Sequence, residues 1–222
     1  MTFSLCGPRR SSPTLAQLDD ADNRSDPTKT SFLRAKMRRD GDARWMLFGR
    51  TIREALAKND ILGMRGIGQI PHSDKNEGFT AWLHAELQQK VFGFNGAWVR
   101  PYIRSAAEVA RRHAHEYTEV GSDDPSRVTQ LETMAVNELR GIVGTAEQQI
   151  SRAVTNAMMR NASPTSAANA VAGIVLAMRR RTVAMSEYMI ARTHAATTLD
   201  IFRNAGVQRV GIIPEKRRRQ RV

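Results

Sequence analysis

Five histidines and one cysteine are the residues of this chain best suited to acid–base, nucleophilic or metal chemistry. His113 and His115 stand two residues apart in a predicted helix, so they point to different faces, whereas a helical metal pair needs a spacing of three or four. Cys6 has no neighbouring His, and no Ser stands in a Gly-x-Ser-x-Gly turn. The other histidines are His72, His84 and His194. We therefore expect no catalytic residue, no metal site and no cofactor.

Two further patterns invite a chemical interpretation. Asp19-Asp20 and Asp123-Asp124 are carboxylate pairs, but both lie in loop-like stretches before helices, where Asp is a common capping residue. The glycine-rich stretch from Gly63 to Pro71 lacks the Gly-Lys-Ser/Thr of a phosphate loop, and no strand precedes it. We interpret the carboxylate pairs as helix caps and the glycine-rich stretch as a connector.

The positive charge of the chain is the most informative property, since 34 Lys and Arg stand against 22 Asp and Glu, a net charge of +12. One cluster, Arg34 to Lys58, holds eight cations and three anions, and a second, Arg209 to Val222, holds six cations and one anion. Such clusters favour nucleic acid or an acidic protein surface, although a solvated face remains an alternative for the first, mixed cluster. The candidate DNA-binding residues are Arg38, Arg39, Lys216, Arg217, Arg218, Arg219 and Arg221.

The elements that would carry these residues are almost all helical. Residues 4 to 30 are rich in Pro, Ser and Asp without apolar periodicity, which is typical of an extended arm. Apolar residues at steps of three and four predict a helix from about Ser31 to Lys58, with a candidate break at Gly41. The same periodicity predicts a helix from Phe79 that ends near Gly93 to Gly96, and another from Trp98 to Gly121.

The second half of the chain shows the strongest helical pattern. An unbroken apolar stripe from Val128 to Ala157 predicts one long helix, which ends before Ser163 and Pro164, a helix-start signal. We expect one helix through Met178 and a last one after Arg179-Arg180-Arg181, ending at Gly206 in the left-handed C′ position. The β-branched residues between Val207 and Ile213 predict a short strand.

These patterns predict a mainly α fold, an elongated bundle of long amphipathic helices with an extended N-terminal arm and a short β-strand near the C-terminus. The expected parts are the arm (1–30), an N-terminal helical part (31–121), a C-terminal helical part (122–213) and a basic tail (214–222). No stretch is apolar enough over about 18 residues to suggest a membrane span. The ten methionines and three tryptophans lie at helical spacing, and we interpret them as core residues rather than as a binding groove.

Three stretches of the second half form a more specific pattern. They are Ile150 to Pro164, then Ile190 to Thr193, then Asn204 to Val207. Together they resemble the phage head-morphogenesis family, the Mu F-like minor head proteins, and Phe79 to Ile103 is similar to that family's N-terminal helical part. The family has Glu after Ala-Arg-Thr, where this chain has His194. The motif residues with expected structural roles are Ser163, Pro164, Ala191, Arg192, Thr193 and Gly206.

The resemblance implies a minor structural protein of a phage capsid. Such a protein would be assembled in the host cytoplasm and would lie inside the virion near the portal, in several copies within a larger assembly. It would contact the portal or the major capsid protein, and packaged double-stranded DNA nonspecifically, and it would aid head assembly and DNA packaging or delivery. It would need no cofactor and no membrane.

Two other function classes compete with this interpretation. A free DNA-binding regulatory or nucleoid-type protein would also use basic clusters, but no clear helix-turn-helix signature is present. An enzyme such as a nuclease or an ADP-ribosyltransferase would require acidic or metal-binding residues that the sequence does not place together.

Overall fold

A computed structural model describes residues 2–6, 28–58, 72–119, 121–207 and 209–213. The long helices are α2 (Ser31–Lys58), α3 (His72–Glu86), α4 (Arg100–His115), α5 (Pro125–Met159) and α6 (Pro164–Asn204). A π-helical segment, η2 (Leu87–Phe92), and a 3₁₀ segment, η3 (Phe94–Val99), lead from α3 into α4. The prediction of a mainly helical fold is confirmed.

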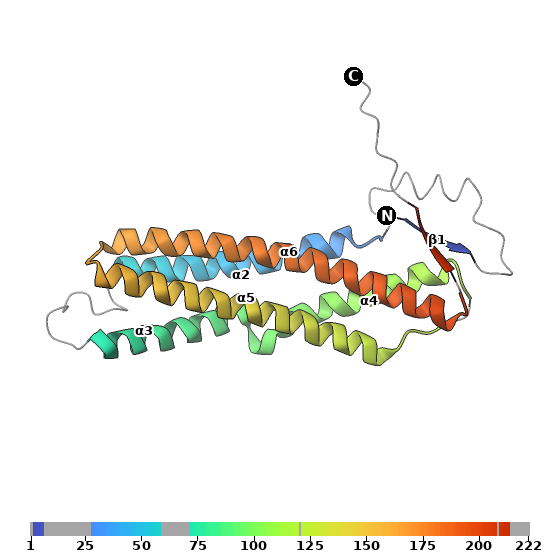
Figure 1. The fold of residues 1–222 in the computed structure, drawn as a ribbon, viewed down its shortest axis with the longest axis horizontal. Helices are drawn as coiled ribbons and strands as arrows, with labels where there is room; N and C mark the ends of the chain where they lie inside the picture. The colour runs from blue at the N-terminus through green and yellow to red at the C-terminus, as the bar shows by residue number, and fades with distance from the viewer. Residues whose placement is uncertain (1, 7–27, 59–71, 120, 208, 214–222) are drawn as a thin grey trace, which may run out of the picture.

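The helices lie roughly along one axis, which makes the molecule elongated (Figure 1). Helix α6 packs against α2, α4 and α5. Its first half lies beside α2 and its second half beside α4, as the picture shows. Two strands, β1 (Thr2–Cys6) and β2 (Arg209–Ile213), pair antiparallel with Thr2 opposite Ile213. The backbone of β2 thus follows soon after the end of α6, at one end of the bundle.

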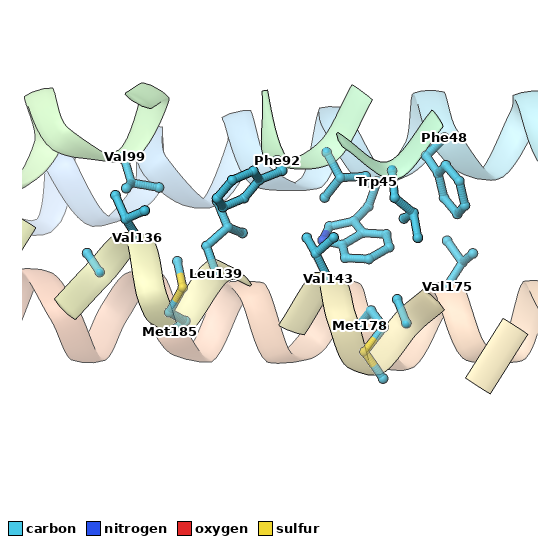
Figure 2. Packing of buried hydrophobic residues seen from close by; sticks show 14 of the residues in the cluster. Trp45, Phe48, Phe92, Val99, Val136, Leu139, Val143, Val175, Met178 and Met185 are labelled. Carbon is cyan, nitrogen blue, oxygen red and sulfur yellow. The ribbon is translucent and has the colours of Figure 1, made fainter. Parts of the chain in front are cut away.

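One continuous core holds the helices together. Figure 2 shows three of its members close together: Trp45 from α2, Val143 from α5 and Met178 from α6. Trp45 and Phe48 are fully buried and meet edge to face at 5.9 Å between ring centroids. Burial of such a side chain contributes roughly 1.5–3 kcal/mol, so this core supplies the main driving force for folding. The same core includes residues from both predicted helical parts of the chain.

The helix ends follow the capping signals of the sequence. Asp124 accepts a hydrogen bond from the Ser126 backbone at 2.8 Å and caps α5. Ser163 caps α6, with Pro164 in the first turn, as predicted. At the other end Gly206 has a φ of 75°, and the Val207 N–H donates to the Phe202 carbonyl, as in a Schellman motif. The cap predictions are confirmed at Asp124, Ser163 and Gly206, whereas Asp123 is not a cap, because its carboxylate pairs with Arg111.

The prediction of two helices in the last third of the chain is wrong. Helix α6 runs without interruption through Arg179-Arg180-Arg181. Arginine is a good helix former, and Met178 and Thr182 on either side are both buried, so the apolar stripe passes straight through the charged triplet. The charged residues alone gave no physical reason for a break.

Other helix boundaries differ from the sequence prediction as well. Helix α3 begins at His72, seven residues before the expected start at Phe79. Helix α2 is continuous at Gly41. The glycine does not break the helix but allows α2 to lie close to Thr182 of α6. Helix α4 ends at His115, six residues before the expected end at Gly121. The buried stripe of α4 ends with Ala114, and the Thr118 N–H donates a hydrogen bond to the Ala114 carbonyl. By contrast, the helical pattern from Phe79 does end at Gly93, where φ is 67°.

Candidate functional site

Histidines in the described part of the chain make pairwise contacts. His84 lies 3.1 Å from Glu147, and His115 Nδ1 lies 3.2 Å from the Thr118 carbonyl. His113 meets His194 of α6, with 3.4 Å between Nδ1 and Nε2. This pairing brings together residues from distant parts of the sequence, which their spacing did not reveal. Within the described part of the chain, no three His, Cys, Asp or Glu residues are grouped so that they could hold a metal ion.

Two of the three acidic residues of the first basic cluster make hydrogen bonds to other helices. Asp40 accepts a hydrogen bond from the Tyr102 hydroxyl of α4. Asp42 accepts two hydrogen bonds from the Arg179 guanidinium of α6, at 2.7 and 2.8 Å. Such a bidentate pair is directional as well as electrostatic, and it fixes α2 against α6. Two of the three anions of this cluster are therefore occupied in contacts between helices.

The Asp40 contact changes the acidity of Tyr102. Burial, then the hydrogen bond to Asp40, raises the pKa of the Tyr102 phenol to about 12. The phenol therefore stays protonated as a donor at physiological pH. Because the phenol keeps its proton and joins the middle of α2 to the start of α4, we interpret this contact as structural.

The cations of α2 fall into two groups: those that contact other elements of the fold and those that are exposed. Arg44 lies over the Trp98 ring at 5.0 Å and donates to the Lys90 carbonyl at 3.5 Å, so it serves the packing of α2 on the η2–η3 segment. The predicted DNA-binding residues Arg38 and Arg39 are exposed, and Arg38 lies 4.0 Å from Glu187. The other exposed cations of α2 are Lys36, Arg50 and Arg53.

Helix α6 adds cations to this surface. In the sequence, these arginines suggested only a boundary between two helices. Arg180 and Arg181 are exposed, beside the tied Arg179. The two helices are antiparallel, because Arg38 lies near Glu187, Gly41 lies against Thr182 and Gly49 lies against Val175. Between them, Trp45 Nε1 donates to Thr182 Oγ1 at 2.8 Å. We call the exposed cations of the two helices the α2–α6 basic face; they are Lys36, Arg38, Arg39, Arg50, Arg53, Arg180 and Arg181. A sequence signal existed, since no Asp or Glu occurs between Pro164 and Ser186.

A groove lined by apolar residues and arginines opens between the same two helices. Its cavity volume is about 240 Å³. Met46, Arg50 and Arg53 line it from α2, and Val171, Val175 and Leu176 line it from α6. Met46 is 42% exposed and Leu176 is 45% exposed, so the apolar lining reaches the surface. Among the described residues that line the groove, none is acidic.

The residues of the family-like motif have structural positions. Ser163 and Pro164 start α6, and Gly206 ends it. Thr193 is fully buried and donates to the Met189 carbonyl at 2.8 Å. Ala191 is exposed, and so is Arg192, which donates to the Tyr188 hydroxyl at 2.6 Å. His194 is 2% exposed in its contact with His113.

Several predicted features lie outside the described residues. The basic tail residues are among them, namely Lys216, Arg217, Arg218, Arg219 and Arg221. The glycine-rich stretch from Gly63 to Pro71 and most of the N-terminal arm are outside as well. In the part of the chain that is described, no helix combines the length and the apolar character that crossing a bilayer would require.

A comparison of this chain with protein-family models, with curated proteins and with solved structures found no match. The resemblance to the phage head-morphogenesis family therefore remains a prediction from the sequence motifs.

Proposed function

We propose that this chain is a structural protein of a phage head, a minor capsid protein associated with the portal, which contacts packaged double-stranded DNA through its cations. The α2–α6 basic face is the observation that carries the proposal. Asp40 and Asp42 are turned to contacts between helices, while the cations of the same helix stay exposed. The result is a face of two adjacent helices on which positive charge predominates.

Such a face suits nonspecific binding of DNA. Duplex DNA carries a dense row of phosphates, and Lys or Arg contacts release the counterions condensed on it. Exposed arginines on straight antiparallel helices can follow a backbone without reading bases, because base readout needs an element inserted into a groove. We propose that the basic tail adds to these DNA contacts.

Salt-dependent DNA affinity tests the proposal. Arg38→Gln with Arg39→Gln should weaken binding to duplexes of any sequence and reduce the slope of log K against log salt by roughly 0.9 for each phosphate that the variant no longer neutralises. Arg152→Gln with Arg160→Gln is the matched control, because it removes two exposed charges from the far end of α5 and beyond its last residue. Unchanged slopes in the first variant, or an equal decrease in the control, would contradict the assignment of the DNA-binding face.

A free DNA-binding protein of regulatory or nucleoid type is the alternative that the same basic face supports. The two functions differ in where the chain resides. Purified phage heads should contain this chain together with the portal protein if the proposal is right. A chain that binds DNA but is excluded from heads would favour the alternative.

A further inference from the structure

The α2–α6 groove is an apolar surface that the fold leaves uncovered. Met46 and Leu176 line it and are each more than 40% exposed, and the neighbouring Leu47 is 52% exposed. Exposed apolar side chains gathered beside a hollow are typical of a site that another surface covers. At about 240 Å³ the groove is smaller than the roughly 300–1,000 Å³ of most small-molecule sites. A groove of this size suits the apolar side chains of a partner better than a cofactor.

The rim of the groove defines the charge of its occupant. Arg50 and Arg53 line one side. Arg180 is exposed and follows Leu176 by one helical turn on the other side, so it extends the same stripe. Arg179 also lines the groove, but its charge is matched by Asp42. The nearest acid in the sequence of α2, Glu54, is exposed and does not line the groove. The groove therefore combines apolar residues with positive charge; we call its apolar lining residues the floor, and Arg50, Arg53 and Arg180 the rim.

This combination discriminates between classes of ligand. A DNA backbone would pair with the arginines but would leave the apolar floor uncovered, since its outer surface is charged. An uncharged apolar helix would cover the floor but would place nothing against the guanidinium groups. An amphipathic helix with acidic residues beside its apolar stripe satisfies both, because apolar anchors at spacings of three and four enter such grooves and flanking carboxylates meet the rim.

We propose that the groove between α2 and α6 binds an acidic amphipathic helix of a partner protein. The apolar anchors of that helix would lie between Met46 and Leu176, and its carboxylates would pair with Arg50, Arg53 and Arg180. This inference goes beyond DNA binding, because it uses apolar residues that DNA does not contact, although Arg50, Arg53 and Arg180 belong to both surfaces. It assigns to one surface of the chain a protein partner of defined chemistry.

The test uses the full chain and a synthetic helical peptide with Leu at positions i, i+4 and i+7 and Glu at the flanking positions. In a spectrum of the ¹³C-labelled methionine methyl groups, the peptide should shift the Met46 signal and leave that of Met159, which is 78% exposed on α5, in place. The same peptide with Lys in place of Glu should bind at least tenfold more weakly. Binding of both peptides with equal affinity, or no shift of Met46, would overturn the proposal.

Variants separate this site from the DNA-binding face. Leu176→Ser with Met46→Ser should lower peptide affinity at least tenfold and leave DNA affinity unchanged, whereas Arg38→Gln with Arg39→Gln should do the reverse. Met159→Ser is the matched control for an exposed apolar residue. If the chain self-associates and the groove variant abolishes that association, a second copy of the chain covers the groove, and the proposal of an acidic partner is wrong.

Discussion

At the scale of single residues, a small cluster in the middle of α2 determines how the helices meet. Gly41 is buried, and a Cβ placed there would lie 2.8 Å from Thr182 Cγ2 and 3.3 Å from the Trp98 ring. Thr182 accepts a hydrogen bond from Trp45 Nε1 and donates to the Met178 carbonyl, so it has little freedom to move. Glycine at this position therefore permits close contact between helices.

The first prediction compares two glycines in helices. Gly41→Ala should destabilise the protein by about 1–3 kcal/mol, because the added methyl group overpacks the contact with Thr182. Gly141→Ala should stabilise it by about 0.5–1 kcal/mol, because Gly141 is exposed on α5 and a Cβ there meets no atom within 4 Å. Urea unfolding followed by circular dichroism measures both. Equal stabilisation by the two substitutions would show that α2 and α6 do not approach closely at Gly41.

A second prediction at this scale concerns Tyr102. Its pKa is raised from 10.0 to about 12, so the folded state holds the phenolic proton more tightly than the unfolded state does. The stabilisation is fully present below pH 10 and is lost as the pH rises from 10 through 12. Absorbance at 295 nm should show one phenol that ionises near pH 12, and Asp40→Asn should move that step to lower pH. Tyr102→Phe should remove the step, whereas Tyr188→Phe should leave it in place.

At the scale of elements, charged pairs join α4 to α5 in addition to the apolar stripes of the two helices. The end of α4 is joined to the loop before α5 by Arg111, which donates to both carboxylate oxygens of Asp123, at 2.7 and 2.8 Å. Glu132, only 4% exposed on α5, accepts a hydrogen bond from Arg104 at the start of α4. These pairs set the angle and register of α4 against α5, which a stripe rich in alanine alone defines poorly.

The third prediction tests the Arg111–Asp123 contact by pH. The hydrogen bonds from Arg111 are the main reason why the pKa of Asp123 lies below its usual value, so the contribution is present above about pH 4 and is lost as the pH falls through the lowered pKa. Asp123→Asn should cost about 1 kcal/mol at pH 7, and its difference from wild type should shrink at acid pH. Glu138→Gln, at an exposed position of α5, is the control. A difference that persists unchanged at pH 2 would contradict the assignment.

At the scale of the whole molecule, the fold is a long bundle rather than a compact one. Helix α6 has 41 residues, a length of about 60 Å at 1.5 Å per residue, and α5 lies beside it (Figure 1). An elongated molecule has more surface than a compact one with the same number of residues. This property suits a component of a larger assembly. The basic face and the apolar groove both lie along this length, on α2 and α6.

The fourth prediction is that the isolated chain is elongated in solution. A compact domain of this length would have a radius of gyration of roughly 17 Å, and small-angle X-ray scattering of the isolated chain should give a larger value. The pair-distance distribution should be skewed toward long distances, beyond the length of α6. A symmetric distribution with a radius near the compact value would show that the helices do not lie along one axis. Because the measurement reports shape, it is independent of any partner.

The sequence by itself determined the ends of α2, α5 and α6, because capping residues and apolar periodicity are local properties. Ser163, Pro164 and Gly206 identified both ends of α6, and the stripe from Val128 identified α5. The sequence also predicted that arginines of α2 are exposed, because charged residues on the polar side of an amphipathic helix face the solvent. The resemblance to phage head proteins comes from the sequence alone.

Only the tertiary structure decided which residues meet. The pairing of Asp42 with Arg179, of Tyr102 with Asp40 and of His113 with His194 joins positions 62 or more residues apart, and no local pattern encodes such contacts. The structure also showed that Arg179-Arg180-Arg181 lies inside a helix, which places Arg180 and Arg181 beside α2 rather than in a loop. The groove between α2 and α6 depends on how closely two helices approach, and this distance is set by packing at Gly41 and Gly49.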